Sequence, residues 1–266
     1  MPREKIDCEA LEAKSRHYFE RMRLFEFLEI DSGIIMTEHD SSGRFIPLTQ
    51  IKDSTSLTRF ITEMIPLLHL APIHAEPLKY IVSELVRNVL EHADSSRGAF
   101  VAAQYYSKSN TVRIGISDVG VGISRTIRKS HHSTDDLQSI RLALTPGITG
   151  TTDREGGTEQ NAGAGLFFVK SIAAVNSDFF VIYSGTAFYK LLKQKTENKN
   201  PLQADPLEDR HSAGNDYPHW QGTVIGIDLA LDVNEQFTAL LEHIRNVYAK
   251  AVRARKHARY KKPIFV

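Results

Sequence analysis

Glu84-Leu-Val-Arg-Asn88-Val-Leu-Glu-His92 is the stretch from which the fold of this chain is worked out. It lies in a predicted helix, because apolar residues recur at helical spacing between positions 78 and 90. Pro77 is expected near the first turn of that helix, where a missing N–H group costs nothing. Since Glu84 and Asn88 are four residues apart, we expect both side chains on the same flank of the helix, one turn apart.

A carboxylate one turn from a carboxamide can hold a divalent ion and a water molecule together. The carboxylate accepts a proton, and the amide oxygen is a ligand for a hard metal ion. On their own, Glu84 and Asn88 are better explained as the solvated face of an amphipathic helix. Motifs further along the chain change that interpretation.

The composition is that of an ordinary globular protein, with 41% hydrophobic and 24% charged residues. A length of 266 residues fits one large domain or a core domain with additions. The net charge of +1 provides no overall field for nucleic acid. The single cysteine, Cys8, excludes an intrachain disulfide and suits a reducing compartment. Because we find no signal peptide and no long apolar run, we expect a cytoplasmic protein without a membrane segment.

The first 74 residues form a predicted N-terminal extension of helical and mixed structure. The pattern indicates a helix to about residue 30, a short strand at 34–36, a turn at 40–43, an extended piece at 45–48 and a helix from 54 to about 68. This region carries no recognisable chemistry. We expect it to serve in packing, partner binding or dimerisation.

A mixed α/β domain is predicted over residues 75–232. Strands at 100–106 and 111–117 are expected to pair antiparallel, because the second alternates apolar residues with polar or small ones. Further along we expect a helix at about 134–144, a helix from Leu166, a strand at 179–183 and a closing strand at 222–229.

Two segments of this domain are poor in core-forming residues. Residues 147–162 are rich in glycine and threonine and are expected to be mobile. Residues 193–218 are polar and proline-rich, as in a surface insertion or a disordered loop. The chain ends in a predicted helix within residues 233–266, and the last turns of that helix carry seven cations and no acid: Lys250, Arg253, Arg255, Lys256, Arg259, Lys261 and Lys262.

The second motif is Asp118-Val-Gly120-Val-Gly122-Ile123, at the end of a predicted strand. A buried carboxylate beside a glycine turn can accept a hydrogen bond from an exocyclic amine such as adenine N6, while the glycines let a ring approach the backbone. Taken alone, the motif is explained more simply as a turn in which the aspartate caps its own backbone.

The third motif is Gly163-Ala164-Gly165-Leu166, which opens a predicted helix. Glycines at a helix N-terminus expose amide N–H groups where the helix dipole favours a phosphate. No Gly-Lys-Ser/Thr follows, and a long loop rather than a strand precedes, so neither a Walker A loop nor a dinucleotide fingerprint is present. Thr223, in the closing strand, is unremarkable on β-propensity alone.

Taken in order, these motifs resemble the GHKL ATPase superfamily, which comprises gyrase, the heat-shock chaperone, histidine kinases and MutL, with the anti-sigma serine kinases alongside. Glu-x-x-x-Asn at 84–88 is followed by Asp-x-Gly-x-Gly at 118–122, Gly-x-Gly-Leu at 163–166 and Gly-Thr at 222–223. The resemblance covers residues 75–230. It implies a two-layer α/β sandwich, in which a mixed, mainly antiparallel sheet carries helices on one face and ATP binds between helices and lid.

The resemblance also implies a role for each motif residue. Asn88 would bind the magnesium ion that bridges the ATP phosphates, and Glu84 would be the general base that activates a water or a substrate hydroxyl. Asp118 would read the adenine amine, with Thr223 supporting the same contact through water. The other positions divide between the adenine pocket, with Gly120, Gly122 and Ile123, and the phosphate cradle, with Gly163, Ala164, Gly165 and Leu166, while residues 147–162 would be the ATP lid.

The sequence departs from the family pattern at two positions. Asn161 stands where the phosphate motif often begins with glycine, and Glu91 stands where many histidine kinases carry lysine. His92 resembles the anti-sigma kinase pattern and equally fits a structural histidine on the helix. His17 lacks the context of a phosphoacceptor histidine, so we do not expect autophosphorylation on histidine.

Three functions follow from these expectations. The first is a magnesium-dependent ATP-binding regulator that acts as a switch on a protein partner and hydrolyses ATP or phosphorylates a serine on a partner of the anti-sigma-antagonist type. The second is a slow ATPase that forms a homodimer on ATP binding, with the N-terminal residues exchanged. The third, which we do not favour, is a nucleic-acid adaptor that uses the basic C-terminal helix, because such a tail is usually only solvated.

Overall fold

The structure is a computed structural model that describes residues 15–34, 44–158, 162–193, 202–231 and 237–259. It is built on one seven-stranded sheet with the order β1-β2-β3-β7-β4-β5-β6, in which all neighbouring strands are antiparallel. The strands are β1 (Phe45–Ile51), β2 (Ala99–Tyr106), β3 (Thr111–Ser117), β4 (Phe180–Gly185), β5 (Ala187–Leu191), β6 (His211–Gly214) and β7 (Trp220–Ala230).

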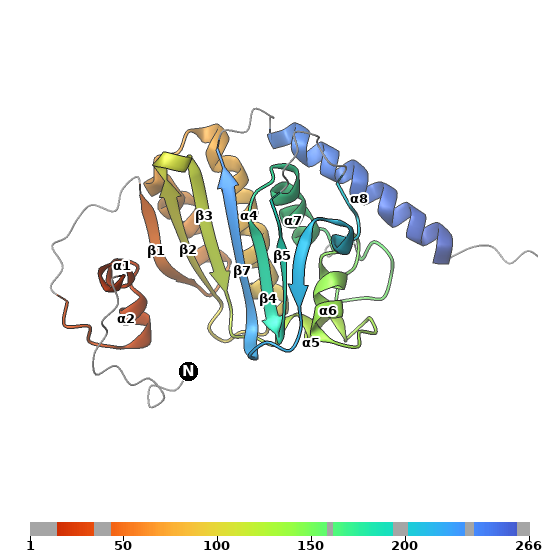
Figure 1. Cartoon of the computed structure of the whole chain (residues 1–266), viewed down its shortest axis with the longest axis horizontal. Helices are drawn as coiled ribbons and strands as arrows, with labels where there is room; N and C mark the ends of the chain where they lie inside the picture. The colour runs from red at the N-terminus through yellow and green to blue at the C-terminus, as the bar shows by residue number, and fades with distance from the viewer. Residues whose placement is uncertain (1–14, 35–43, 159–161, 194–201, 232–236, 260–266) are drawn as a thin grey trace, which may run out of the picture.

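Helices α4 (Pro72–His92) and α7 (Gly165–Val175) cover one face of this sheet (Figure 1). The other helices are α1 (Arg16–Arg21), α2 (Leu24–Leu28), α3 (Ser54–Arg59), α5 (Gly122–Ile127), α6 (Asp136–Ala143) and α8 (Phe237–Arg259). The expected two-layer α/β sandwich is confirmed. None of the helices in the described ranges is long and apolar enough to cross a bilayer.

The core lies between the sheet and α4, as the periodicity of the helix predicts. The expected apolar face of α4 is buried: Leu78, Ile81, Val82, Leu85, Val86 and Val89. The alternate residues of β3, Val112, Ile114 and Ile116, are buried as well. This packing fixes the rotation of α4, and therefore the direction of its polar flank.

The start of α4 corrects one expectation. Pro72, not Pro77, occupies the first turn, and Pro77 lies inside the helix. The helix extends further toward the N-terminus because the amides of His74 and Ala75 both donate to the carbonyl of Ala71, at 2.9 and 3.0 Å. An internal proline removes one backbone hydrogen bond, which the long helix accommodates.

The N-terminal region also differs from the expected single helix. Within the described residues it forms α1 and α2, separated by Arg23, which has a left-handed backbone with φ of 59°. Both helices contact β2. The Tyr18 hydroxyl of α1 donates to Gln104 at 2.9 Å, and the Phe27 ring of α2 packs edge to face on Phe100, with 5.6 Å between the ring centroids. These β2 side chains alternate with the core-facing ones, so α1 and α2 reach the opposite face of the sheet.

Other N-terminal expectations have mixed outcomes. The extended piece at 45–48 is confirmed as part of β1, and the helix over 54–68 is continuous, although it passes from α to a π-helical turn at Phe60–Met64 and a 3₁₀ turn at Ile65–Leu68. The expected turn at 40–43, most of the strand at 34–36 and the first 14 residues fall outside the described residues.

Residues 193–218 are expected to be a surface insertion or a disordered loop. Disorder is wrong for residues 202–218, which the structure describes as ordered. Residues 202–214 supply a 3₁₀ turn at Pro206–Glu208 and the edge strand β6. They are fixed by Lys170 of α7, which is fully buried and pairs with Asp209 at 2.6 Å. The Tyr189 hydroxyl donates to the carbonyl of Pro206 at 2.7 Å. Polar residues are therefore ordered here by buried partners from other elements.

The strand that comes last in the chain is central in the sheet. β7 lies between β3 and β4, with Ser117 opposite Val224, and the amide of Asp118 donates to the carbonyl of Thr223 at 2.9 Å. This register brings the second motif beside Thr223.

Candidate nucleotide site

A cavity of about 320 Å³ lies against the polar flank of α4. Every residue predicted for the site lines it except Gly120: Glu84, Asn88, Asp118, Gly122, Ile123, Gly163, Ala164, Gly165, Leu166 and Thr223. These residues come from α4, from the loop between β3 and α5, from the start of α7 and from β7. The fold therefore brings four motifs that are separated in the sequence to one cavity.

The α4 side of the cavity fits tightly against the start of α7. A Cβ atom at Gly165 would lie 2.8 Å from Oε2 of Glu84 and 3.4 Å from Nδ2 of Asn88. Only glycine allows this approach without displacement. The backbone at the N-terminus of α7 therefore lies directly beside the paired carboxylate and amide.

Asn88 has an unsatisfied polar atom in the cavity. Its Nδ2 atom is buried and has no hydrogen-bond partner among the described residues. Leaving such a group unpaired costs on the order of 1–3 kcal/mol, so a bound group is expected to satisfy it. Since a rotation of the side chain exchanges the amide nitrogen and oxygen, the same position can offer an oxygen to a metal ion. The residue fits a phosphate-bound magnesium ion.

Glu84 is half-buried, and burial raises the pKa of its carboxyl group. Arg87 opposes this shift and Glu91 adds to it. A carboxylate with a raised pKa accepts a proton more readily than an exposed one. Glu84 is therefore chemically suited to general-base work.

The opposite end of the cavity is formed around Asp118, which is only 2% exposed. Its Oδ1 atom accepts a hydrogen bond of 2.7 Å from the amide of Gly120. Burial raises the pKa of Asp118, while hydrogen bonds from Gly120 and Thr223 oppose the shift. The Trp220 indole donates to the Asp118 carbonyl at 3.3 Å. The carboxylate is thus held in one place by fixed donors.

Gly120 corrects the expectation that it floors the adenine pocket. Its Cβ atom, if present, would lie 2.1 Å from the carbonyl of Ala93, at the end of α4. The next amide, that of Val121, donates to the same carbonyl at 2.7 Å. Gly120 therefore joins the loop to α4 and lies outside the cavity lining.

Gly222 is a residue that the sequence interpretation undervalued. Its φ of +105° is left-handed, and an added Cβ atom would lie 2.2 Å from the carbonyl of Asp118. Gly222 therefore lets β7 approach the aspartate closely enough for Thr223 to line the cavity. The Gly-Thr dipeptide in the sequence was the available signal.

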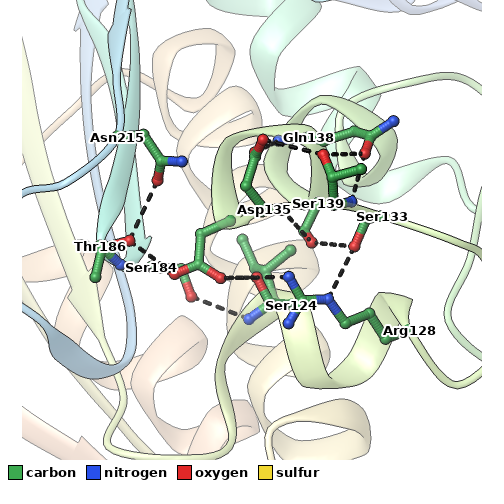
Figure 2. A network of polar contacts seen from close by, with 12 residues as sticks. Ser124, Arg128, Ser133, Asp135, Gln138, Ser139, Ser184, Thr186 and Asn215 are labelled. Carbon is green, nitrogen blue, oxygen red and sulfur yellow. Dashed lines mark hydrogen bonds and ion pairs between the residues drawn. The ribbon is translucent and has the colours of Figure 1, made fainter.

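A polar network behind this end holds the loop in place (Figure 2). The Ser184 hydroxyl accepts from the amide of Ile123 at 3.0 Å and donates to the carbonyl of Gly222 at 2.7 Å. Asp136 accepts from Ser124 at 2.5 Å and from the amide of Thr186 at 2.8 Å. α5, α6 and β4 are thereby linked to the residues that surround Asp118.

The glycine- and threonine-rich segment 147–162 borders the cavity with both of its ends. Ile148, Thr149 and Gly150 line one side, and Ala162 lines another. The amide of Gly147 donates to the carbonyl of Gly163 at 3.0 Å, which joins the two ends. Residues 159–161 fall outside the described residues, and the expected mobility stays a prediction.

Further lining residues come from the same flank of α4. Arg87, Glu91 and His92 all border the cavity. Positions 84, 88, 91 and 92 share one helix face at this spacing, so the periodicity could have added Glu91 and His92 to the site. The contacts of Thr126 and Ala143 with the cavity depend on tertiary packing and carry no sequence signal.

A two-layer sandwich with an amide and carboxylate on one helix, a buried aspartate and a glycine-rich helix start defines an ATP-binding domain. Residues 73–199 match the family model described as Histidine kinase-, DNA gyrase B-, and HSP90-like ATPase. This match identifies residues 73–199 as a domain of the GHKL superfamily, which the motifs also indicate. A search of curated proteins finds no match. Thr223 and β7 lie beyond the matched range.

Proposed function

We propose that this protein is a magnesium-dependent, ATP-binding regulatory domain that acts as a nucleotide switch. The observation that carries the proposal is the convergence of all but one of the predicted residues on a single cavity. The family supports ATP as the nucleotide. The suitability of Cys8 for a reducing compartment supports a cytoplasmic location.

Each side chain has a proposed role at the site. Asn88 is the protein's ligand to magnesium, and Glu84 is the general base. Asp118 accepts the hydrogen bond of the adenine amine, with Thr223 beside it. The amides at Gly163, Ala164, Gly165 and Leu166 receive the phosphates, because the N-terminus of α7 favours negative charge, and Gly122 and Ile123 border the base.

Binding is tested by titrating ATP into the wild-type protein and Asn88→Ala, with and without magnesium. The variant is expected to lose the magnesium-dependent part of the affinity, because the amide oxygen is a hard-metal ligand. Equal magnesium dependence in the two proteins would remove Asn88 from the metal site. Absence of ATP binding by the wild type would refute the proposed function altogether.

The chemical outcome of binding is proposed to be ATP hydrolysis or phosphotransfer to a serine of a partner protein of the anti-sigma-antagonist type. The raised pKa of Glu84 supports a base for either nucleophile. Incubation with radiolabelled ATP and the protein of a neighbouring gene separates the two. Free labelled phosphate without labelled partner would eliminate the kinase.

A slow ATPase that dimerises on ATP binding is the second candidate. The attachment of α1 and α2 to the opposite sheet face through contacts such as Tyr18–Gln104 favours it, since such a segment can exchange between copies. Light scattering with a non-hydrolysable ATP analogue tests this candidate, and an unchanged mass would exclude it.

The nucleic-acid adaptor has less support. Two of its basic residues are engaged within the chain, since Arg255 pairs with Glu155 and Arg259 pairs with Asp153, each at 2.9 Å. Binding to duplex DNA that weakens steeply with salt would restore this candidate.

A further inference from the structure

The C-terminal helix α8 makes two successive sets of contacts. Its first half packs on the ATP-binding domain, where the Phe237 ring meets Tyr80 of α4 at 5.8 Å and the Tyr248 ring meets Phe168 of α7 at 6.0 Å. Leu240 and Ile244 are buried in the same core. Beyond Tyr248, the helix continues past α7 toward the loop between α6 and α7 (Figure 1).

The second half of α8 contacts the lid, residues 147–162. Tyr248, Val252, Arg255 and Arg259 recur at helical spacing and form one face. Three of them contact polar groups near or within the lid: the Tyr248 hydroxyl donates to the carbonyl of Ala162 at 2.6 Å, Arg255 pairs with Glu155 and donates to the carbonyl of Pro146, and Arg259 pairs with Asp153.

The fourth residue of this face, Val252, fits against two lid glycines. A Cβ atom at Gly147 would lie 2.6 Å from one Val252 methyl group, and a Cβ atom at Gly156 would lie 3.0 Å from the other. Val252 is only 7% exposed as a result. Both glycines also have left-handed backbones, with φ of +74° and +85°. The lid glycines therefore accommodate α8 as well as the turns of the lid.

These contacts hold both ends of the lid beside the cavity. Pro146 precedes the lining residues 148–150, and Ala162 precedes the phosphate cradle that begins at Gly163. The anchoring at the first end is shared with the turn that follows α5, because the Ser130 hydroxyl donates to the carbonyl of Gly150 at 3.0 Å. At the other end, the Tyr248 hydroxyl provides a contact from outside the lid.

We propose that Tyr248 and Arg255 are positioning residues of the nucleotide site. By fixing the lid ends before ATP arrives, α8 lowers the ordering cost of binding the phosphates, which is the usual gain from preorganisation. This inference rests on the proposed function. It links α8, the described part of the third predicted domain, to the ATP site. Neither side chain lines the cavity, so both act through the lid.

The decisive experiment compares Arg255→Glu with Arg253→Glu. Both variants place the same charge change on α8, but Arg253 is exposed and makes no ion pair within the described residues. With magnesium present, Arg255→Glu is expected to weaken binding of a non-hydrolysable ATP analogue by about tenfold and to leave adenosine binding unchanged. Arg253→Glu is expected to match the wild type for both ligands.

Charge exchange provides the rescue. Arg255→Glu combined with Glu155→Arg restores the ion pair with reversed polarity but not the hydrogen bond to the Pro146 carbonyl, and it places a cation beside Arg259. We therefore expect affinity for the ATP analogue to recover in part, above that of Arg255→Glu alone. Tyr248→Phe keeps the ring packing on α7 and removes only the hydroxyl. Tyr248→Phe is expected to lower the affinity for the ATP analogue by a few-fold and to leave the affinity for adenosine unchanged. It therefore tests the inference independently if Arg255→Glu misfolds.

Two results would overturn the inference: equal affinity of Arg255→Glu and Arg253→Glu for the ATP analogue, or an equal loss of adenosine and ATP analogue binding. Hydrogen exchange separates this failure from failure of the proposed function. If the wild type binds no nucleotide, the proposed function falls. Amide exchange over residues 147–157 in Arg255→Glu then shows whether α8 holds the lid, with unchanged protection excluding it.

Discussion

The two ends of the nucleotide cavity are held by different kinds of contact. Around Asp118, backbone lies against backbone, with Gly222 and Gly120 so close to neighbouring carbonyls that no side chain fits. The lid, in contrast, is contacted by long side chains of α8. In the ion pair between Arg255 and Glu155, the two side chains are 29% and 16% exposed. The Asp118 end should therefore tolerate almost no change, while the lid end should respond gradually to charge and salt.

Gly222→Ala is expected to have the largest effect. The added methyl group meets the carbonyl of Asp118 in a left-handed backbone, so we expect a loss of about 3 kcal/mol or more in the free energy of unfolding. Urea denaturation and ATP binding measure it. Gly115→Ala is the matched control, since a Cβ atom there has no neighbour within 4 Å. Equal stability of the two variants would contradict the inference that the Asp118 end is rigid.

Glu84→Gln tests the chemistry between the two ends. The amide cannot accept the proton, so turnover is expected to fall by about 10²-fold or more, while ATP affinity stays near that of the wild type. Steady-state phosphate release and calorimetric titration measure the two quantities. A parallel loss of both would mean that Glu84 contributes to binding and is not the base.

Asn88→Ala should have a smaller effect, confined to the magnesium-dependent part of ATP affinity. We expect a loss of about tenfold with magnesium and little change with a chelator, because in the proposed site the remaining phosphate contacts are made by backbone amides. Adenosine affinity is the internal control, as Asp118 lies at the other end of the cavity. Weaker adenosine binding would show that the ends are not independent.

A substitution at Asp178 is expected to change the free energy of unfolding without touching either end of the cavity. Burial raises the pKa of its carboxyl group to about 6, from 3.8. The folded state therefore holds this proton more tightly than the unfolded chain, and the resulting stability is present below about pH 4 and lost as the pH rises through about 6. Asp178→Asn keeps an acceptor for the amide of Ala230, which donates to Asp178 at 3.1 Å.

We expect Asp178→Asn to raise the free energy of unfolding at pH 7.5 by on the order of 2 kcal/mol, and to change it little at pH 4. Thermal melts at the two pH values measure this. The affinity of Asp178→Asn for ATP should equal that of the wild type at both pH values. If it rises with stability, site effects of the other variants could reflect global folding, and the comparison between the two ends would lose its basis.

The contrast between local and distant contacts also explains what the sequence could predict. The helical period of α4 and the alternation in β3 are local, so the face that carries Glu84 and Asn88 was predictable. The partner of Gly120 is a carbonyl 27 positions earlier, at Ala93, and no pattern near Gly120 reveals it. A glycine beside a site was therefore assigned to the ligand when it serves the backbone.

The same reasoning applies to the two polar regions. Lys170 is charged and fully buried, which composition does not predict, because its partner Asp209 is 39 positions away. The basic end of α8 has the composition of a solvated tail. Its spacing of 248, 252, 255 and 259 was visible, but the acids that it meets lie about 100 positions earlier in the chain.

The smallest expected effect is that of Asp153→Asn at the outer edge of the lid. The pair with Arg259 is 68% and 42% exposed, so solvent screening limits its contribution to about 0.5 kcal/mol at low salt. We expect less than a twofold change in affinity for the ATP analogue, which disappears at about 0.5 M salt. Glu155→Gln, which removes the less exposed acid, should have a larger effect that salt reduces less strongly. If the two variants behaved identically, the affinity for the ATP analogue would depend on the net charge of the lid and not on the contact between Arg255 and Glu155.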